Sequence, residues 1–290
     1  MARRRGQRLR AFALAAALAG LVLLAFGYRG ATAPPAVRRL TVHIAGTVPF
    51  DRLRVVLLAD IHAHGPDMPP QRIAALVEAV NRLRPDVVLL AGDFVGNSAL
   101  GRSYTPAEAI APLAGLTPRL GTFAALGNND LIAGAEAVTQ ALRAAGVRVL
   151  DREAVEVGPL ALGGLPPRGR DTEATAGAVR ETAAAMGRLP GTGILLAHEP
   201  DYFPLVPQGI PLMLAGHTHC GQIALPFWGP LRTGSDYGRR YGCGFIREQG
   251  HSLVVSGGIG TSHVPLRLFA ASDLWVVDFF PAARRTQPAP

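Results

Sequence analysis

Two histidines stand one residue apart in the segment AGHTHCGQ, residues 215–222. The segment follows an apolar run at 210–214, so His217 and His219 stand where a strand should end in a glycine-flanked turn. Imidazole is a common metal ligand, and a pair at one strand end could serve a metal site. The alternative is a pair of exposed loop histidines. The choice depends on whether the rest of the chain supplies further ligands.

Four other apolar runs also end in residues able to bind a metal, in the segments ADIH, AGDF, GNND and LAHEP. Ligands of α/β sheets bind beyond the carboxyl ends of strands, so five strand ends can deliver side chains to one rim. Residues i and i+2 of a strand face one side, which lets each D-x-H or H-x-H pair reach one cavity. Each fragment alone is weak evidence, but their combination is specific. The seven candidate ligands are Asp60, His62, Asp93, Asn128, His198, His217 and His219.

Apolar runs alternate with helical patterns along the body of the chain, which predicts an α/β domain with strands buried on both faces. We predict strands within 53–60, 86–93, 121–130, 147–150, 153–157, 160–164, 192–200, 211–219, 252–260 and 273–279, and helices within 69–85, 105–116, 135–146 and 173–187. No internal repeat stands out. We therefore expect one catalytic domain over 40–280 and a disordered tail over 281–290.

The net charge of +8 is confined to the N-terminus. Residues 1–39 hold eight arginines and no acid, whereas residues 40–290 hold 21 arginines and 21 acids. The body is therefore neutral and lacks the electrostatic footprint that phosphate-backbone binding needs. We expect no nucleic-acid partner.

An uncharged apolar stretch over residues 11–28 follows the first arginines. Its 18 residues fall within the roughly 17–25 needed to cross a bilayer as a helix. We expect a signal-anchor helix joined to the body by a linker ending at 39. The positive-inside rule puts the arginines in the cytoplasm and the catalytic domain on the extracytoplasmic side of a single-pass protein. Export after cleavage near ATA, residues 31–33, and a buried helix remain alternatives.

The blocks together resemble those of the calcineurin-like metallophosphoesterases, which run D-x-H, G-D, G-N-H-[DE], H and G-H-x-H in this order. The resemblance covers about residues 53–279 and implies a two-sheet β-sandwich flanked by helices. It implies that one metal is held by Asp60, His62 and His219 and the other by Asn128, His198 and His217, with Asp93 bridging them. The segments GHTHCGQIALPFWGP and GGIGTSHVPLR are similar to a narrower branch of membrane-anchored or exported bacterial phosphodiesterases.

The resemblance implies two divalent ions that clamp a phosphoryl oxygen and share a water whose pKa falls toward ~7. The mixed carboxylate, amide and imidazole ligands suit Mn²⁺, Fe or Zn²⁺, and we favour Mn²⁺. The expected substrate is a phosphodiester or pyrophosphate, and a membrane tether suggests one that is envelope-associated, such as a lipid-linked phosphate ester. A sensor or scaffold of the same fold with weakened catalysis is the alternative, and the block order disfavours another two-metal hydrolase such as an amidase.

One position departs from the family pattern, because Asn129 stands where a histidine usually follows Gly-Asn. Asparagine can donate a hydrogen bond but cannot transfer a proton, so the catalytic acid is in question. We therefore treat Asn129 and its neighbour Asp130 as candidate catalytic residues. His64 and His263 are candidate substitute acids, with an ordinary loop or pocket-wall role as the alternative for each.

Three further features leave alternatives open. Cys220 and Cys243 are the only cysteines; an oxidising compartment favours their pairing, while free thiols or a Cys220 metal ligand remain possible. Arg267 could neutralise substrate phosphate or form a surface ion pair. Phe227 and Trp228 could form an apolar lip, but buried packing is the expectation for large aromatic side chains.

Overall fold

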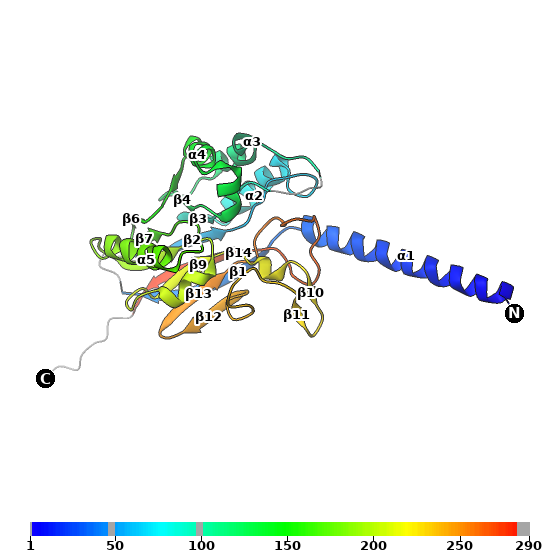
Figure 1. The fold of residues 1–290 in the computed structure, drawn as a ribbon. Coiled ribbons are helices and arrows are strands. Elements are labelled where there is room, and N and C mark those ends of the chain that lie inside the picture. Colours follow the sequence, from blue (N-terminus) through cyan, green and yellow to red (C-terminus); the bar gives the residue numbers. More distant parts are fainter. Residues whose placement is uncertain (1, 46–49, 97–100, 283–290) are drawn as a thin grey trace.

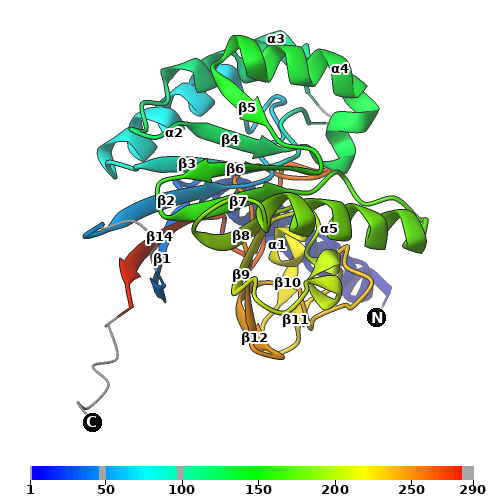
Figure 2. The same ribbon diagram turned by 90° about the vertical axis from the view of Figure 1, so that its left-hand side faces the viewer.

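The computed structural model describes residues 2–45, 50–96 and 101–282. Two six-stranded sheets pack face to face with helices on their outer faces, and one long helix, α1 (Ala2–Thr32), projects from the body (Figures 1 and 2). The predicted two-sheet α/β sandwich with one N-terminal helix is therefore confirmed.

The first sheet has the strand order β1-β14-β2-β3-β4-β5. Its strands are β1 (Ala36–Ile44), β2 (Leu53–Leu58), β3 (Val87–Ala91), β4 (Thr122–Ala125), β5 (Val147–Val149) and β14 (Asp273–Pro281). The strands from β2 to β5 are parallel, and β14 is antiparallel to β2. Its outer face is covered by α2 (Pro70–Arg82), α3 (Pro106–Ile110), the 3₁₀ helix η1 (Ala111–Gly115) and α4 (Asn128–Ala144).

The second sheet has the order β12-β13-β9-β8-β7-β6, and its four central strands are parallel. Its strands are β6 (Glu153–Val157), β7 (Leu160–Gly164), β8 (Thr192–Leu196), β9 (Leu212–Ala215), β12 (Gly244–Glu248) and β13 (His251–Val255). Helix α5 (Thr172–Met186) and the 3₁₀ helix η2 (Pro200–Leu205) cover its outer face. A short 3₁₀ turn, η3 (His219–Gly221), precedes a separate hairpin of β10 (Ala224–Leu225) and β11 (Gly229–Pro230).

The core between the sheets is built from the apolar runs that the sequence presents as continuous rather than alternating. Leu57 and Leu89 of the first sheet share one buried cluster with Leu196 and Leu214 of the second. Because helices cover the outer faces, the central strands are buried on both sides, as parallel strands usually are. Burying one leucine side chain stabilises the fold by roughly 1.5–3 kcal/mol. This rigid sandwich holds the strand ends in fixed relation.

Two edge strands were not predicted. Strand β1 (Ala36–Ile44) begins inside the stretch predicted as a linker, and β12 (Gly244–Glu248) lies in a stretch with no predicted element. Both are edge strands with exposed positions, and β1 pairs with β14 from the other end of the chain, so no local apolar pattern marks it. Helix α4 also begins at Asn128, seven residues before the predicted start at 135. Residues 283–290 of the predicted tail lie outside the described residues.

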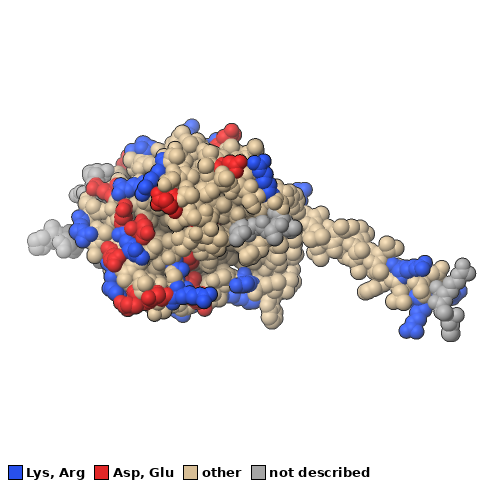
Figure 3. Space-filling model, turned by 45° about the horizontal axis from the view of Figure 1, so that its top comes forward, with Lys and Arg blue, Asp and Glu red and all other residues tan. Residues whose placement is uncertain are grey.

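The N-terminal helix leaves the body as an exposed rod whose visible arginines gather near its free end (Figure 3). In the described part of the chain, residues 4–32 form the one helix long and apolar enough to cross a membrane, a property that signal sequences share. The C-terminal end of α1 and the residue that follows it are hydrogen-bonded to the body. The Arg267 N–H donates to the Gly27 carbonyl at 2.8 Å, and the Arg72 guanidinium donates to the Ala31 and Ala33 carbonyls at 2.8 and 2.9 Å. A cation at these carbonyls also suits the helix dipole.

Cys220 and Cys243 form a disulfide, with their Cα atoms 4.8 Å apart. The expected pairing is confirmed, and the free-thiol and Cys220-ligand alternatives are wrong. The bond closes a loop that contains the β10–β11 hairpin and holds the residue next to His219.

Replacing both cysteines by alanine should destabilise the full chain. The sequence separation of 23 predicts a loss of about 3 kcal/mol from loop-closure entropy, or roughly 6–12 °C in Tm for a domain of this size. Thermal unfolding in detergent, with and without reductant, measures it. Reductant should lower the Tm of the parent protein and leave the double variant unchanged; an unaltered parent Tm would show that the bond does not stabilise the fold.

Candidate metal centre

The seven predicted ligands meet at one end of the sandwich, a few residues after the ends of β2, β3, β4, β8 and β9. Backbone hydrogen bonds continue the pairing beyond the strand ends. The Asp60 backbone N–H donates to the Gly92 carbonyl at 3.0 Å, and the His62 backbone N–H donates to the backbone carbonyl of Asp93 at 2.9 Å. The two sheets are joined here because the His217 N–H donates to Asp60 Oδ2 at 2.9 Å.

Most of these residues lie just after a strand, in the left-handed region of backbone space. Five of the seven have positive φ, namely Asp60 (52°), His62 (45°), Asp93 (56°), His217 (72°) and His219 (51°). The two residues of each D-x-H and H-x-H pair do converge, but not because alternate residues of an extended strand face one side. Each pair lies beyond its strand, and its left-handed backbone directs both side chains to the site. Each such non-glycine residue costs on the order of 1–3 kcal/mol and persists only where the surroundings hold it.

One group of ligand atoms consists of Asp60, His62 and His219, which are buried together. His62 Nε2 lies 3.1 Å from His219 Nε2, and Asp60 Oδ1 lies 3.5 Å from His219 Nε2. Two atoms each about 2.1 Å from one ion, at tetrahedral to right angles, lie ~3.0–3.4 Å apart. The spacing of this group is therefore close to that of ligands around a single cation.

A second group forms around His198. Its Nε2 lies 3.2 Å from Asn128 Oδ1 and 3.1 Å from His217 Nδ1, while its Nδ1 contacts the Ala91 carbonyl at 2.7 Å. In the neutral imidazole, a proton on Nδ1 would satisfy that carbonyl and leave the Nε2 lone pair directed at the group, as in many metal-ligating histidines.

The carboxylate of Asp93 lies between the two groups. Its Oδ2 is 3.3 Å from His62 Nε2 and 3.3 Å from His198 Nε2. Asn129 fixes the carboxylate, since its backbone N–H donates to Oδ1 at 2.8 Å and its Nδ2 donates to Oδ2 at 2.7 Å. A single oxygen thus faces both groups, which is the position that a bridging ligand needs.

The charges of the site fit a cation. Burial raises the pKa of Asp60 to about 7 and lowers the pKa of both His62 and His217 to about 4, so these imidazoles are neutral at pH 7. Burial also opposes ionisation of Asp93, but His198, His62 and Asn129 outweigh it and lower the pKa of Asp93. Burial likewise opposes protonation of His198, but the Asp93 carboxylate outweighs it and raises the pKa of His198. His198 is thus the one imidazole among these three that balances a buried carboxylate, and divalent cations would supply further counter-charge. The donor set therefore fits two such ions.

Asp130 has a positioning role in the structure. Its buried carboxylate accepts hydrogen bonds from the backbone N–H groups of Asp93, Phe94 and Gly127, each at 2.8 Å. It thereby caps α4 and holds the loop that carries Asp93. Glycine is needed at position 127, because a Cβ there would collide with the Asp93 carboxylate.

A cavity of about 560 Å³ opens over the ligands. Polar residues of its lining include Asp93, Asn128, Asn129, His217 and His219, and apolar residues include Ile132, Ile223, Leu231 and Val264. His263 also lines this cavity. His64 is instead buried against the His62 carbonyl, at 2.7 Å from Nδ1, and Asp67, at 3.2 Å from Nε2. Of the two candidate substitute acids, His263 is thus the one on the cavity wall.

Three side chains differ from their sequence-based expectations. Arg267 is 2% exposed and donates to the carbonyls of Gly257 and Gly260 at 2.6 and 2.7 Å, so it is neither a surface ion pair nor a phosphate ligand. Phe227 and Trp228 are exposed rather than buried, because they lie on the tip of the β10–β11 hairpin.

Glu199 was not predicted as a site residue, although it directly follows His198. It is buried, forms a possible ligand group with His198 and His217, and accepts a hydrogen bond from the Arg168 N–H at 3.1 Å. Burial raises its pKa to about 7. In the sequence, the only indication of a site role for Glu199 was its position next to His198, a candidate metal ligand.

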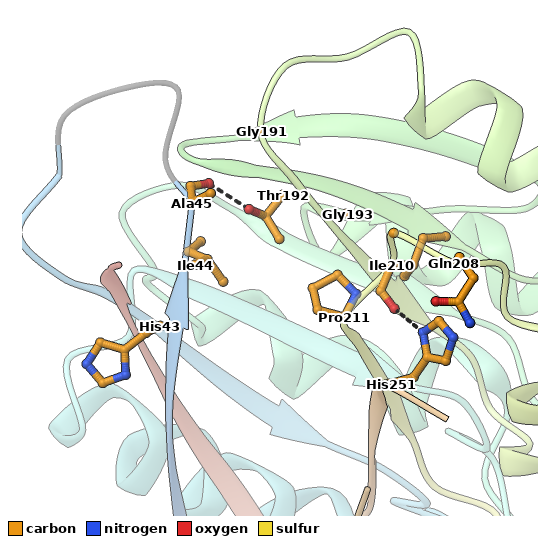
Figure 4. A pocket seen from close by; sticks show the side chains of 12 residues that line it. His43, Ile44, Ala45, Gly191, Thr192, Gly193, Gln208, Ile210, Pro211 and His251 are labelled. Atoms are coloured by element: carbon orange, nitrogen blue, oxygen red, sulfur yellow. Dashed lines mark hydrogen bonds between the residues drawn. The ribbon is translucent and has the colours of Figure 1, made fainter. Parts of the chain in front are cut away.

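Another cavity, of about 480 Å³, lies at the opposite ends of the central strands, near the starts of β8 and β9 (Figure 4). Two of its polar side chains are engaged within the protein, since the Thr192 hydroxyl donates to the Ala45 carbonyl and His251 Nδ1 contacts the Ile210 carbonyl, both at 2.8 Å. The candidate ligands all lie at the other end of these strands.

Substituting Asp93 by asparagine should remove metal from the protein. A neutral amide cannot supply the negative oxygen that faces both groups, and loss of even an outer partner of a metal ligand costs about 10–100-fold in affinity. Elemental analysis after dialysis against Mn²⁺ measures the bound ions. Glu156→Gln, on the exposed face of β6, is the matched charge-removing control. Full metal content in Asp93→Asn would show that Asp93 is not a ligand.

The chain matches known proteins over most of this architecture. The model of the calcineurin-like phosphoesterase family matches residues 53–221. A transmembrane protein with metallophosphoesterase domain from Danio rerio is 32% identical over 275 residues; the match covers 87% of this chain and 59% of that relative's length. The phosphodiesterase YaeI of Escherichia coli (strain K12) is 28% identical over 77% of this chain and 80% of its own.

Among solved structures, the 5'-nucleotidase precursor from Thermus thermophilus aligns with a TM-score of 0.46 and 18% identity, over 72% of this chain and 49% of that one. The family model covers more than half of the chain, including the seven candidate ligands. The chain therefore belongs to the calcineurin-like phosphoesterase family.

Proposed function

We propose that this protein hydrolyses a phosphodiester or pyrophosphate bond with two bound divalent metal ions, and that its substrate is associated with a membrane. Family membership makes it a hydrolase of phosphoester bonds. The observation that carries the two-metal proposal is the position of Asp93 Oδ2, at 3.3 Å from a histidine nitrogen of each ligand group.

In the proposed site, one ion would be held by Asp60, His62 and His219 and the other by Asn128, His198 and His217, with Asp93 shared between the two. The oxygen and nitrogen donors suit Mn²⁺, Fe or Zn²⁺, with Mn²⁺ favoured here. When bound, such a pair of ions polarises a phosphoryl oxygen and lowers the pKa of water toward ~7.

The protein's own residues would orient the substrate in this site. Asn129 lies on the cavity wall with its amide committed to Asp93, so it positions the bridging carboxylate and leaves proton donation to another group. We assign proton donation to His263 or to water, and we expect substrates whose leaving group departs without strong acid assistance, such as a pyrophosphate. Asp130 acts through the backbone of the Asp93 loop.

We further propose that α1 is retained as a membrane anchor, with its arginines in the cytoplasm and the catalytic domain on the other side. Cleavage after residue 33 would remove the carbonyls of Gly27, Ala31 and Ala33 from their donors on the body. It would also expose the face that Ala31, which is fully buried, packs against. These contacts favour retention over export as a cleaved protein.

The second candidate function is a metal-binding sensor or scaffold with weakened catalysis. The observation in its favour is Asn129, which stands where the family pattern has a histidine. The cavity over the ligand groups favours the enzyme, because a site that only binds metal needs no open space of about 560 Å³ above it.

The purified full chain should hydrolyse bis-para-nitrophenyl phosphate when supplied with Mn²⁺. Chelator should abolish the activity, and added Mn²⁺ should restore it, because bound ions would polarise the phosphoryl group and lower the pKa of the attacking water. Absorbance of released para-nitrophenol measures the rate, with Asp93→Asn as the inactive control. If protein with full metal content hydrolyses neither this diester nor a pyrophosphate, the sensor or scaffold alternative holds.

Replacing Asn129 by histidine should raise turnover selectively. A general acid contributes roughly 10²–10⁴-fold when the leaving group is poor, so hydrolysis of an alkyl phosphodiester should rise on the order of 10²-fold. The para-nitrophenyl ester needs little acid assistance and should change little. Comparing kcat on the two substrates tests this. An equal change on both, or none, would show that position 129 does not limit proton transfer.

A further inference from the structure

An apolar surface extends over the β10–β11 hairpin and the neighbouring segment 266–269. We define the hairpin surface by its exposed side chains, which are Leu225 (47%), Phe227 (111%), Trp228 (67%), Leu231 (58%) and Phe269 (59%). The run from 224 to 232 contains no Asp or Glu. Contiguous apolar side chains exposed in this way mark an interaction site rather than ordinary surface.

The hairpin surface is joined to the end of α1 by direct contacts. Segment 266–269 pairs with the hairpin on one side, where the Ala224 N–H donates to the Leu268 carbonyl at 2.8 Å. On its other side it meets α1, where the Phe26 and Phe269 rings lie 5.8 Å apart and Leu266 and Leu268 pack beside Gly27. Figures 1 and 2 both show β10 and β11 next to the place where α1 leaves the body.

The backbone of the hairpin tip does not by itself favour an aromatic residue. Phe227 has φ 65°, a left-handed conformation that glycine or asparagine adopts at lower cost. Its side chain is fully exposed and therefore packs on nothing within the described chain. No contact within the described chain therefore accounts for an aromatic side chain at this position.

The chemistry of the hairpin surface suits a membrane interface. Tryptophan is enriched at the headgroup level of bilayers, because its ring is apolar and its N–H is polar. The Arg239 guanidinium lies 5.9 Å from the centre of the Trp228 ring, where it can meet lipid phosphate while the ring faces the acyl chains. On the face shown in Figure 3, charged side chains are sparser near the base of α1 than at the far end of the body, where arginines and acids are dense.

We propose that the hairpin surface inserts into the headgroup region of the bilayer that α1 crosses, as a second membrane contact of the catalytic domain. The proposal depends on retention of α1 in a membrane, which is part of the proposed function. Leu231 belongs both to this surface and to the wall of the cavity over the metal ligands. Insertion therefore brings the mouth of the cavity to headgroup depth, where an amphiphilic phosphoester would present its phosphate.

The two tryptophans of the chain provide a direct test. Trp228 lies on the hairpin surface, and Trp275 is 7% exposed in β14. The full chain is reconstituted into vesicles of phosphatidylcholine and phosphatidylglycerol, with or without lipids brominated along the acyl chains. In Trp275→Phe, emission from Trp228 should be blue-shifted and quenched by the brominated lipid. In the matched variant Trp228→Phe, emission from Trp275 should not be quenched.

A labelled variant covers the case in which Trp275→Phe does not fold. The described chain has no free cysteine, so Phe227→Cys can carry a single environment-sensitive fluorophore. Its emission should blue-shift in vesicles, whereas that of Gln208→Cys, at the opposite ends of the strands, should not. Emission from position 227 or 228 that is unquenched by brominated lipid and remains open to aqueous quencher would overturn the proposal. Because neither readout requires turnover, a failed phosphoesterase assay would leave this result unaffected.

Discussion

The structure depends on one electrostatic constraint, which is a buried carboxylate shared by two clusters of imidazole and oxygen ligands. Asp93 lies at the end of β3, in the middle of the first sheet, yet it contacts His62 after β2 and His198 after β8 of the second sheet. Both sheets must therefore keep their carboxyl ends together. The interior between them is close-packed and apolar, so it holds this alignment stiffly.

The constraint explains why the loops around Asp93 are strained and densely hydrogen-bonded. Positive φ values at Asp60, Asp93 and His217 are unfavourable locally, and they persist because backbone groups are fixed by the Asp130 and Asp60 carboxylates. These two acids, like Glu199, have pKa values raised by burial to about 7. Buried acids held by backbone hydrogen bonds are consistent with the preorganised cation site that we propose.

Much of this arrangement could be predicted from the sequence because the signals were local. Long apolar runs indicated the central strands, and polar residues at their ends indicated the seven candidate ligands and the edge at which they meet. Features that depend on distant pairing could not be predicted. Strand β1 is defined by β14, more than two hundred residues away, and Arg267 is buried only because the loop carbonyls of Gly257 and Gly260 surround it. The exposed Phe227 and Trp228 reversed the usual burial of aromatic residues, because they lie on the tip of the β10–β11 hairpin.

The most direct test of the shared carboxylate is the positions of the ions themselves. Crystals of the Mn²⁺-loaded protein, measured at the manganese absorption edge, give anomalous difference density that locates each ion directly. Our account predicts two peaks on either side of Asp93 Oδ2, one beside Asp60, His62 and His219 and one beside Asn128, His198 and His217. A single peak, or two peaks of which one lies away from Asp93, would contradict it.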